Sequence, residues 1–257
     1  MKITVLSENI SETPGVVSEH GLSLYIESSG KRVLFDMGQS ELFSENAKLL
    51  GIDLSLVDFA VISHGHYDHG TGLSRFLEIN KTAPVYMHKD AFAPHFNGKE
   101  KYIGLDSTFA ENDRIVFTDS EISICKDMTL YPAVEDITNK FSSAGLCVFE
   151  NGCFNPDDFR HEQYLVICEN DKRVLFSGCS HRGITNIVEK FRPDVLIGGF
   201  HLSKFSNDEL FEYASFLDKF QTDYYTCHCT GQEQYRFLKS RMRSINYLSC
   251  GETLILE

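Results

Sequence analysis

The chain has 257 residues, of which 42% are hydrophobic and 12% aromatic, so it can bury a sizeable core and is too apolar to be mainly disordered. Its formal net charge of -13 argues against general binding to nucleic-acid backbones, which requires clustered lysine and arginine. No apolar run approaches the roughly 18 residues of a membrane span, and the N-terminus "MKITVLSENI" turns polar too soon for a signal peptide.

The eight cysteines occur without secretory features, which indicates free thiols in a reducing compartment. We therefore expect a cytoplasmic protein with no membrane partner.

An internal repeat organises the chain. "LYIESSGKRVLFDMG" (24–38) is echoed by "LVICENDKRVLFSGC" (165–179), with Lys-Arg-Val-Leu-Phe identical at a shift of 141 positions. Each copy predicts two strands joined by a polar turn. A predicted helix follows each copy, over 41–50 and 184–191, and then an apolar strand, over 57–63 and 193–199. The matched order of elements favours duplication over a chance identity.

The apolar strands are hydrophobic almost without interruption, as expected when both faces of a sheet are covered. Two such halves predict an α/β fold in which the sheets face each other with helices outside, a four-layer αβ/βα sandwich forming one domain over 1–257. The segment 97–139 has weaker periodicity, and we expect it to be an insertion that forms a wall or lid over one edge.

The most informative stretch is "AVISHGHYDHGTGL" (60–73), which places His64, His66, Asp68 and His69 directly after an apolar strand. Alternate side chains of an extended chain point the same way, so His64 and His66 can hold one ion together. Asp68 and His69 then face a neighbouring position. Imidazole with carboxylate suits Zn²⁺, Fe or Mn²⁺. A histidine-rich surface turn is the alternative, but the preceding strand aims the cluster from the core.

"SHGHYDHGTGL" resembles the HxHxDH signature of the metallo-β-lactamase fold superfamily. With "EHGLSLYIESSGKRVLFDMGQS", "SGCSHRGITN", "GGFHL" and "CHCTG", the chain is similar to a subgroup of metal-dependent hydrolases that includes proteins like 7,8-dihydropterin-6-yl-methyl-4-(β-D-ribofuranosyl)aminobenzene 5′-phosphate synthase. The similarity spans most of the chain and is weakest over 97–160. It implies the αβ/βα sandwich, with a two-metal site at one sheet edge.

The resemblance assigns His64 and His66 to the first metal and Asp68 and His69 to the second. Asp36 matches an aspartate that orients a ligand histidine, although a simple turn carboxylate is the alternative.

The second half of the chain must supply the remaining ligands. His181 follows the second hairpin as Asp36 follows the first, and His228 matches a late family histidine. For both, a hydrogen-bonded histidine near the core is the alternative.

The chain also departs from the commonest family pattern. Cys179 stands where many relatives have a bridging aspartate, and it is either a ligand or a buried thiol. The family's histidine before the second hairpin is not obvious, and His161 or Glu162 could fill its place.

The other candidates are less specific. We consider His201 a residue that binds substrate, donates to an oxyanion or ligates metal, and we expect His20 at the rim. For His88 and His95 we favour structural or surface roles, and for Cys227 and Cys229 packing.

The function predicted from these residues is metal-dependent hydrolysis, in which a metal-bound hydroxide attacks a small anionic ester, phosphoester or amide. Asp68 is the predicted catalytic residue, because it can orient the nucleophile and accept its proton. The expected cofactors are two divalent ions, Zn²⁺ first, and the subgroup points to a pterin- or ribose-phosphate-related substrate. An iron-bound redox or sensing protein is the alternative, and a metallo-nuclease ranks third.

Overall fold

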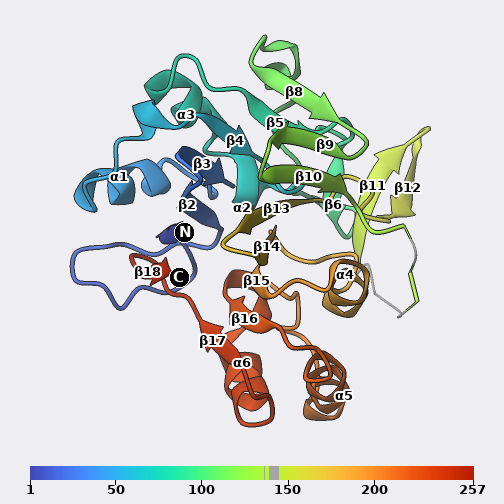
Figure 1. Ribbon diagram of the computed structural model, residues 1–257. Helices are drawn as coiled ribbons and strands as arrows, with labels where there is room; N and C mark the ends of the chain where they lie inside the picture. The colour runs from blue at the N-terminus through green and yellow to red at the C-terminus, as the bar shows by residue number, and fades with distance from the viewer. Residues whose placement is uncertain (136, 139–144) are drawn as a thin grey trace.

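The computed structural model, which describes residues 1–135, 137–138 and 145–257, contains two seven-stranded sheets that face each other (Figure 1). The first has the order β18-β1-β2-β3-β4-β5-β8. Its strands are Lys2–Ser7 (β1), Ser23–Ser28 (β2), Lys31–Phe35 (β3), Phe59–Val61 (β4), Val85–His88 (β5), Ile115–Thr118 (β8) and Thr253–Ile255 (β18). β18 pairs with β1, so the two ends of the chain lie together.

The second sheet has the order β17-β16-β15-β14-β13-β10-β9. Its strands are Ile122–Cys125 (β9), Met128–Pro132 (β10), Gln163–Glu169 (β13), Lys172–Ser177 (β14), Val195–Gly198 (β15), Asp223–Thr226 (β16) and Ile245–Tyr247 (β17). In both sheets the repeated hairpin is antiparallel and is followed by parallel strands. The predicted internal repeat and α/β sandwich are therefore confirmed.

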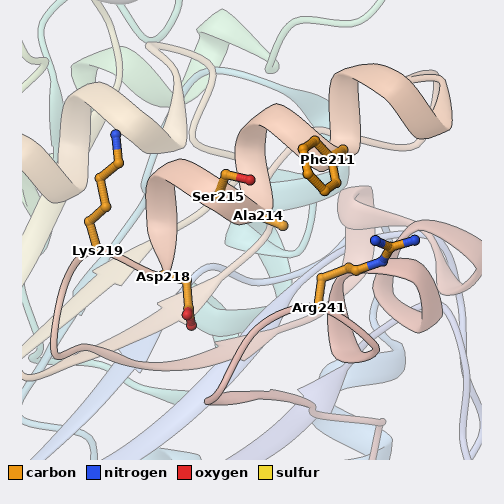
Figure 2. A pocket seen from close by; sticks show the side chains of 6 residues that line it. All are labelled: Phe211, Ala214, Ser215, Asp218, Lys219 and Arg241. Carbon is orange, nitrogen blue, oxygen red and sulfur yellow. The ribbon is translucent and has the colours of Figure 1, made fainter.

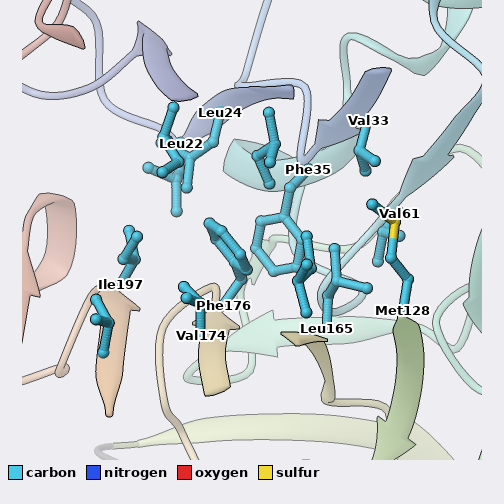
Figure 3. Close-up of a cluster of buried hydrophobic side chains, with 14 of the residues drawn as sticks. Leu22, Leu24, Val33, Phe35, Val61, Met128, Leu165, Val174, Phe176 and Ile197 are labelled. Atoms are coloured by element: carbon cyan, nitrogen blue, oxygen red, sulfur yellow. The ribbon is translucent and has the colours of Figure 1, made fainter. Parts of the chain in front are cut away.

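The repeated residues meet at the centre of the molecule. Phe35 and Phe176, which end the two copies of Lys-Arg-Val-Leu-Phe, lie with their ring centroids 6.0 Å apart and are fully buried. Val33 and Val174, two residues earlier in each copy, point into the same layer (Figure 3). Burying each such side chain contributes about 1.5–3 kcal/mol. The duplication thus supplies both halves of the inter-sheet core.

Helices cover the outer faces of the two sheets (Figure 1). Leu42–Leu49 (α1) and Leu73–Ile79 (α3) pack on the first sheet. Ile184–Phe191 (α4), Asn207–Leu217 (α5) and Gln232–Lys239 (α6) pack on the second. The predicted helix over 184–191 has the observed bounds, because a single apolar face anchors it on the sheet. The remaining helices are short: Leu54–Leu56 (η1), Tyr67–Gly70 (α2), Ser107–Glu111 (η2) and His228–Thr230 (η3).

A third, four-stranded sheet stands beside the sandwich, with the order β12-β11-β6-β7. Its strands are His95–Asn97 (β6), Lys101–Tyr102 (β7), Leu146–Glu150 (β11) and Cys153–Pro156 (β12). Of the segment 97–139, which was expected to form an insertion, β7 joins this sheet, whereas β8, β9 and β10 extend the two large sheets. Residues 136 and 139 of that segment lie outside the described residues. Among the described helices, none has the length and apolar character needed to cross a membrane.

Candidate metal centre

The candidate ligands stand at the carboxyl ends of neighbouring strands. Asp36 follows β3, and the 64–69 motif follows β4. In the second half, His181, His201 and His228 come after β14, β15 and β16. Parallel strands end at the same edge of a sheet, where α/β proteins gather their ligands. The repeat therefore brings two sets of side chains to one edge of the sandwich.

The two sets meet because Gly178 has no side chain. A Cβ atom at this position would lie 2.1 Å from Ser63 Oγ and 3.0 Å from His64 Nδ1. Glycine alone allows the turn after β14 to approach the turn after β4 this closely. The adjacent Cys179 Sγ then lies 3.2 Å from His69 Nε2, across the boundary between the halves.

Asp36 organises the first half of the centre. It is fully buried, and its carboxylate accepts hydrogen bonds from Ser63 N at 2.6 Å, Ser63 Oγ at 2.7 Å and His69 Nδ1 at 2.7 Å. Because the Ser63 hydroxyl donates to Asp36, it must accept from His64 Nδ1, 2.8 Å away. Both histidines are thereby protonated on Nδ1, and Nε2 of each carries a lone pair.

His228 is oriented in the same way from the second half. Its Nδ1 donates to Asn9 Oδ1 at 2.8 Å, and that oxygen also accepts from Gly21 N. The Nε2 lone pair of His228 consequently stands 3.3 Å from Asp68 Oδ2. Two acceptors at this distance repel each other unless a cation lies with them, so this pair suits a metal ion.

The buried ring nitrogens provide an independent test of metal binding. Among the described residues, the ring nitrogens buried without a hydrogen-bond partner are Nε2 of His64, His66, His95, His161, His181 and His228 and also Nδ1 of His181. A buried polar atom left unpaired costs about 1–3 kcal/mol. The rings of His66, His181 and His228 line one cavity, and the His64 ring lies 4.6 Å from that of His66, centroid to centroid. These four imidazoles form a donor set that fits Zn²⁺, Fe or Mn²⁺. The residues present therefore fit the expected cofactor.

The protonation states of His64, His181 and Asp68 are suited to ligation, whereas the pKa of His69, which burial lowers, is raised overall by Asp36 and Asp68. Burial and the neighbouring imidazoles lower the pKa of His64 and His181 well below the usual range, so both rings are neutral at pH 7. Burial alone raises the pKa of Asp68, but His69 and the hydrogen bond from His20 bring it well below its ordinary value. Neutral imidazole and ionised carboxylate are the forms that bind metal.

Three overlapping groups bring these ligand atoms within 4.8 Å of one another. His64, Cys179 and His181 form one, His69, Cys179 and His228 the second, and His20, Asp68 and His228 the third. His66 joins the first group through its ring, whose centroid lies 4.6 Å from that of His64 and 4.9 Å from that of His181. The structure thus assembles all six residues predicted as ligands and places Cys179 between two groups.

A further group contains residues that the sequence did not single out together. His66, His95, Asp157 and His161 are buried, with ligand atoms within 4.8 Å of one another. Asp157 Oδ2 accepts from His95 Nδ1 at 2.8 Å and lies 3.4 Å from His161 Nε2. His161 Nδ1 accepts from Gly65 N at 2.9 Å, so this ring holds the backbone between His64 and His66. His95, for which a structural or surface role was favoured, lies beside the metal centre.

The other candidates take distinct places. Glu162 accepts hydrogen bonds from the backbone of His181 and Arg182 and so orients the turn that carries His181. His88 is largely buried, and its Nδ1 accepts from Asp90 N, away from the ligand groups. Cys227 packs in the inter-sheet core.

A cavity of about 380 Å³ opens over the centre. Its candidate metal ligands are His66, Asp68, Cys179, His181 and His228; the remaining lining residues are Asn9, His20, Tyr67, Asn97, Lys101, Ile103, Leu146, His201, Ser203, Lys204, Cys229 and Gly231. His20, whose side chain is half exposed, contacts Asp68 Oδ2 through Nε2 at 3.0 Å. Another hollow lies against α5, lined by Phe211, Ala214, Ser215, Asp218, Lys219 and Arg241 (Figure 2), and none of these is a histidine or cysteine.

The fold and this centre define a class: proteins with an αβ/βα sandwich that gather histidine and aspartate ligands at one sheet edge. The family model of the metallo-β-lactamase superfamily matches residues 18–219. The chain belongs to the metallo-β-lactamase superfamily.

Relatives agree with this assignment. The chain is 30% identical over 264 residues to 7,8-dihydropterin-6-methyl-4-(β-D-ribofuranosyl)-aminobenzene-5′-phosphate synthase of Methanocaldococcus jannaschii, covering 92% of this chain and 90% of the relative. An uncharacterized protein of the same organism is 31% identical over 224 residues, covering 83% and 85%.

Solved structures show the same fold. Tm1679, a metal-dependent hydrolase of the β-lactamase superfamily, has a TM-score of 0.87 and 34% identity, covering 100% of this chain and 99% of that one. Zn²⁺-bound PqqB from Methylobacterium extorquens has a TM-score of 0.59 at 11% identity, covers 100% of both chains and shows the fold alone.

Proposed function

We propose that the chain is a binuclear metal-dependent hydrolase, with Zn²⁺ as its first candidate metal, that cleaves a small anionic ester, phosphoester or amide. The observation that carries the proposal is the set of unpartnered, buried imidazole nitrogens beside Asp68 in the cavity. The name of the M. jannaschii relative adds pterin- and ribose-phosphate-linked molecules to the proposed substrate class.

The first half would hold its metals through His64, His66, Asp68 and His69, and the second half through His181 and His228. The metals, when bound, would lower the pKa of a water molecule held between these side chains towards neutrality and so supply hydroxide. Metal binding also stabilises the negative charge that develops on oxygen during hydrolysis.

Asp68 and His20 would manage the proton of the attacking water. Asp68 lines the cavity and is held ionised, so its carboxylate can orient water and accept a proton. His20 Nε2 contacts Asp68 Oδ2, and the half-exposed His20 side chain offers that proton a route to solvent. His201 lines the same cavity and is positioned to contact substrate.

The thiols favour one second candidate, an iron-bound redox or sensing protein. Cys179 Sγ lies 3.2 Å from His69 Nε2, and Cys229 Sγ accepts a hydrogen bond from His201 N. Thiolate and imidazole together suit iron as well as zinc.

One experiment separates the two functions. Chelator-treated protein is reloaded separately with Zn²⁺, Mn²⁺ or Fe²⁺ and assayed against a phosphodiester, a thioester and a lactone, with oxygen consumption followed in parallel. Turnover with Zn²⁺ or Mn²⁺ that Asp68→Asn abolishes, and that the exposed-site control Asp58→Asn retains, supports hydrolysis. Oxygen consumption with iron and no hydrolysis under any loading refutes the hydrolase proposal.

A further inference from the structure

We infer that Lys101 and Lys204 form a phosphate-binding subsite in the wall of the metal cavity, which holds a phosphoryl group of the substrate remote from the bond that is cleaved. This inference rests on the proposed function and narrows its substrate class. Both lysines line the cavity that also contains Asp68 and His181. They come from separate parts of the fold, Lys101 from β7 of the third sheet and Lys204 from the segment after β15.

Among the residues that the structure describes, none with an acidic side chain neutralises either ammonium group. Within the described parts of the chain, no ion pair involves Lys101 or Lys204. Three other lysines do form such pairs at 3.0 Å: Lys2 with Glu27, Lys31 with Asp58 and Lys89 with Asp119. The chain as a whole has a net charge of -13. The wall of this cavity nevertheless carries two lysines that have no ion pair with a described residue, so it is locally positive.

Lys204 lies close to the candidate ligand histidines as well as at the rim of the cavity. Lys204 lines the same cavity as His201, which stands three positions before it in the chain. The His201 ring in turn lies 4.4 Å, centroid to centroid, from that of His181. An anion held by Lys204 would therefore lie close to the ligand histidines.

Lys101 is held near the same centre by an aromatic ring. Its Nζ lies 5.5 Å from the centroid of Tyr67, within the range of a cation–π contact. Tyr67 immediately precedes Asp68 in α2, and both line the cavity. This contact places the ammonium over the start of the metal-binding helix, while the apolar Ile103 and Leu146 complete the wall beside it.

The charge of the pair indicates phosphate as the ligand. Two ammonium groups are matched by a phosphate monoester, which carries about -1.5 to -2 at pH 7, whereas a carboxylate carries a single charge. Asp68, the one carboxylate among the described lining residues, is expected to bind metal, so it does not oppose an anion. Gly231, the N-cap of α6, also lines the cavity, and the partial positive charge of a helix N-terminus favours the same ligand.

The test uses two substrates with the same scissile bond. Thymidine 5′-phosphate p-nitrophenyl ester and its 3′-phosphorylated form differ only by one remote phosphate. Because each lysine is exposed, we expect its charge-assisted hydrogen bond to contribute about tenfold to the preference for the phosphorylated form. K101Q/K204Q should lose this preference through KM, with kcat for both substrates within about twofold of wild type. Lys99→Gln removes the same charge two residues from Lys101, outside the cavity, and is the matched control.

Binding provides a readout that does not depend on turnover. Calorimetry of the zinc-loaded protein with thymidine 3′,5′-bisphosphate and thymidine 5′-phosphate should show tighter binding of the bisphosphate to wild type and to K99Q, but not to K101Q/K204Q. If the binding preference appears without hydrolysis, the proposed reaction fails and the subsite stands. If hydrolysis occurs but the double variant keeps the wild-type preference, or K99Q loses as much, the subsite is refuted.

Discussion

Asp36→Asn is the sharpest single perturbation of the metal centre, because one buried carboxylate orients two ligand rings. The amide keeps an oxygen for Ser63 N but places an NH₂ group where Oδ2 accepts from Ser63 Oγ and His69 Nδ1. The Ser63 hydroxyl must then turn to donate to His64 Nδ1. Both rings are driven to carry their proton on Nε2, where the metal should bind.

Two effects follow, and their sizes differ. Two charge-assisted hydrogen bonds are lost, which costs about 3 kcal/mol of a typical stability of about 5–15 kcal/mol, so the chain remains folded. Loss of one hydrogen-bond partner that orients a metal-binding side chain lowers metal affinity by about 10–100-fold. Because Asp36 acts on both His64 and His69, we expect the upper end, about 100-fold.

The assay is competition for Zn²⁺ against a chromogenic chelator, with urea unfolding of the chelator-treated protein to measure stability. Asp58→Asn is the control, since Asp58 also accepts two hydrogen bonds, from Lys31 Nζ and Arg32 N, but at an exposed site. It should leave zinc affinity unchanged. Zinc affinity of folded Asp36→Asn within twofold of wild type would refute the reasoning.

Three further predictions test the centre. Asp68→Asn should keep the circular dichroism spectrum of wild type but reduce turnover by at least about 100-fold; unchanged catalysis would refute its role. His181→Ala should lower the metal content per chain measured by plasma mass spectrometry, and full retention would remove His181 from the ligand set. In the metal-free protein, burial lowers the pKa of His161 from 6.5 to about 4, so the unfolded chain binds the extra proton between these values and stability falls as pH is lowered through this window. Between pH 8 and pH 5 the His161 ring should therefore lower the free energy of unfolding by about 2 kcal/mol. Urea titrations at the two pH values should show that His161→Gln loses about 2 kcal/mol less stability than wild type. Equal losses in the two proteins would contradict the assignment.

The sequence predicted those parts of the fold that repeat or are local. The identical Lys-Arg-Val-Leu-Phe segments indicated two equivalent hairpins, and the structure places Phe35 against Phe176 between them. The apolar periodicity of 184–191 predicted the bounds of α4. Both signals are carried by neighbouring residues and do not depend on long-range pairing.

The residues that the sequence did not gather depend on contacts across long separations. His95 and Asp157 are 62 positions apart. They meet because β11 pairs with β6, which carries His95, and Asp157 N donates to Leu146 O at the start of β11. His161 reaches Gly65 across 96 positions. The sequence around His95, "APHFNG", contains nothing that indicates Asp157 as its partner. Its position beside the candidate metal ligands could therefore be seen only in the structure.

Metal stoichiometry tests the central claim most directly. Chelator-treated wild-type protein is titrated with Zn²⁺, dialysed and measured by plasma mass spectrometry, with anomalous scattering from crystals to locate the ions. We predict two ions per chain, as in two-metal hydrolases, lying among His64, His181 and His228. Protein that retains no zinc, or binds it only at surface sites away from these rings, would contradict the account.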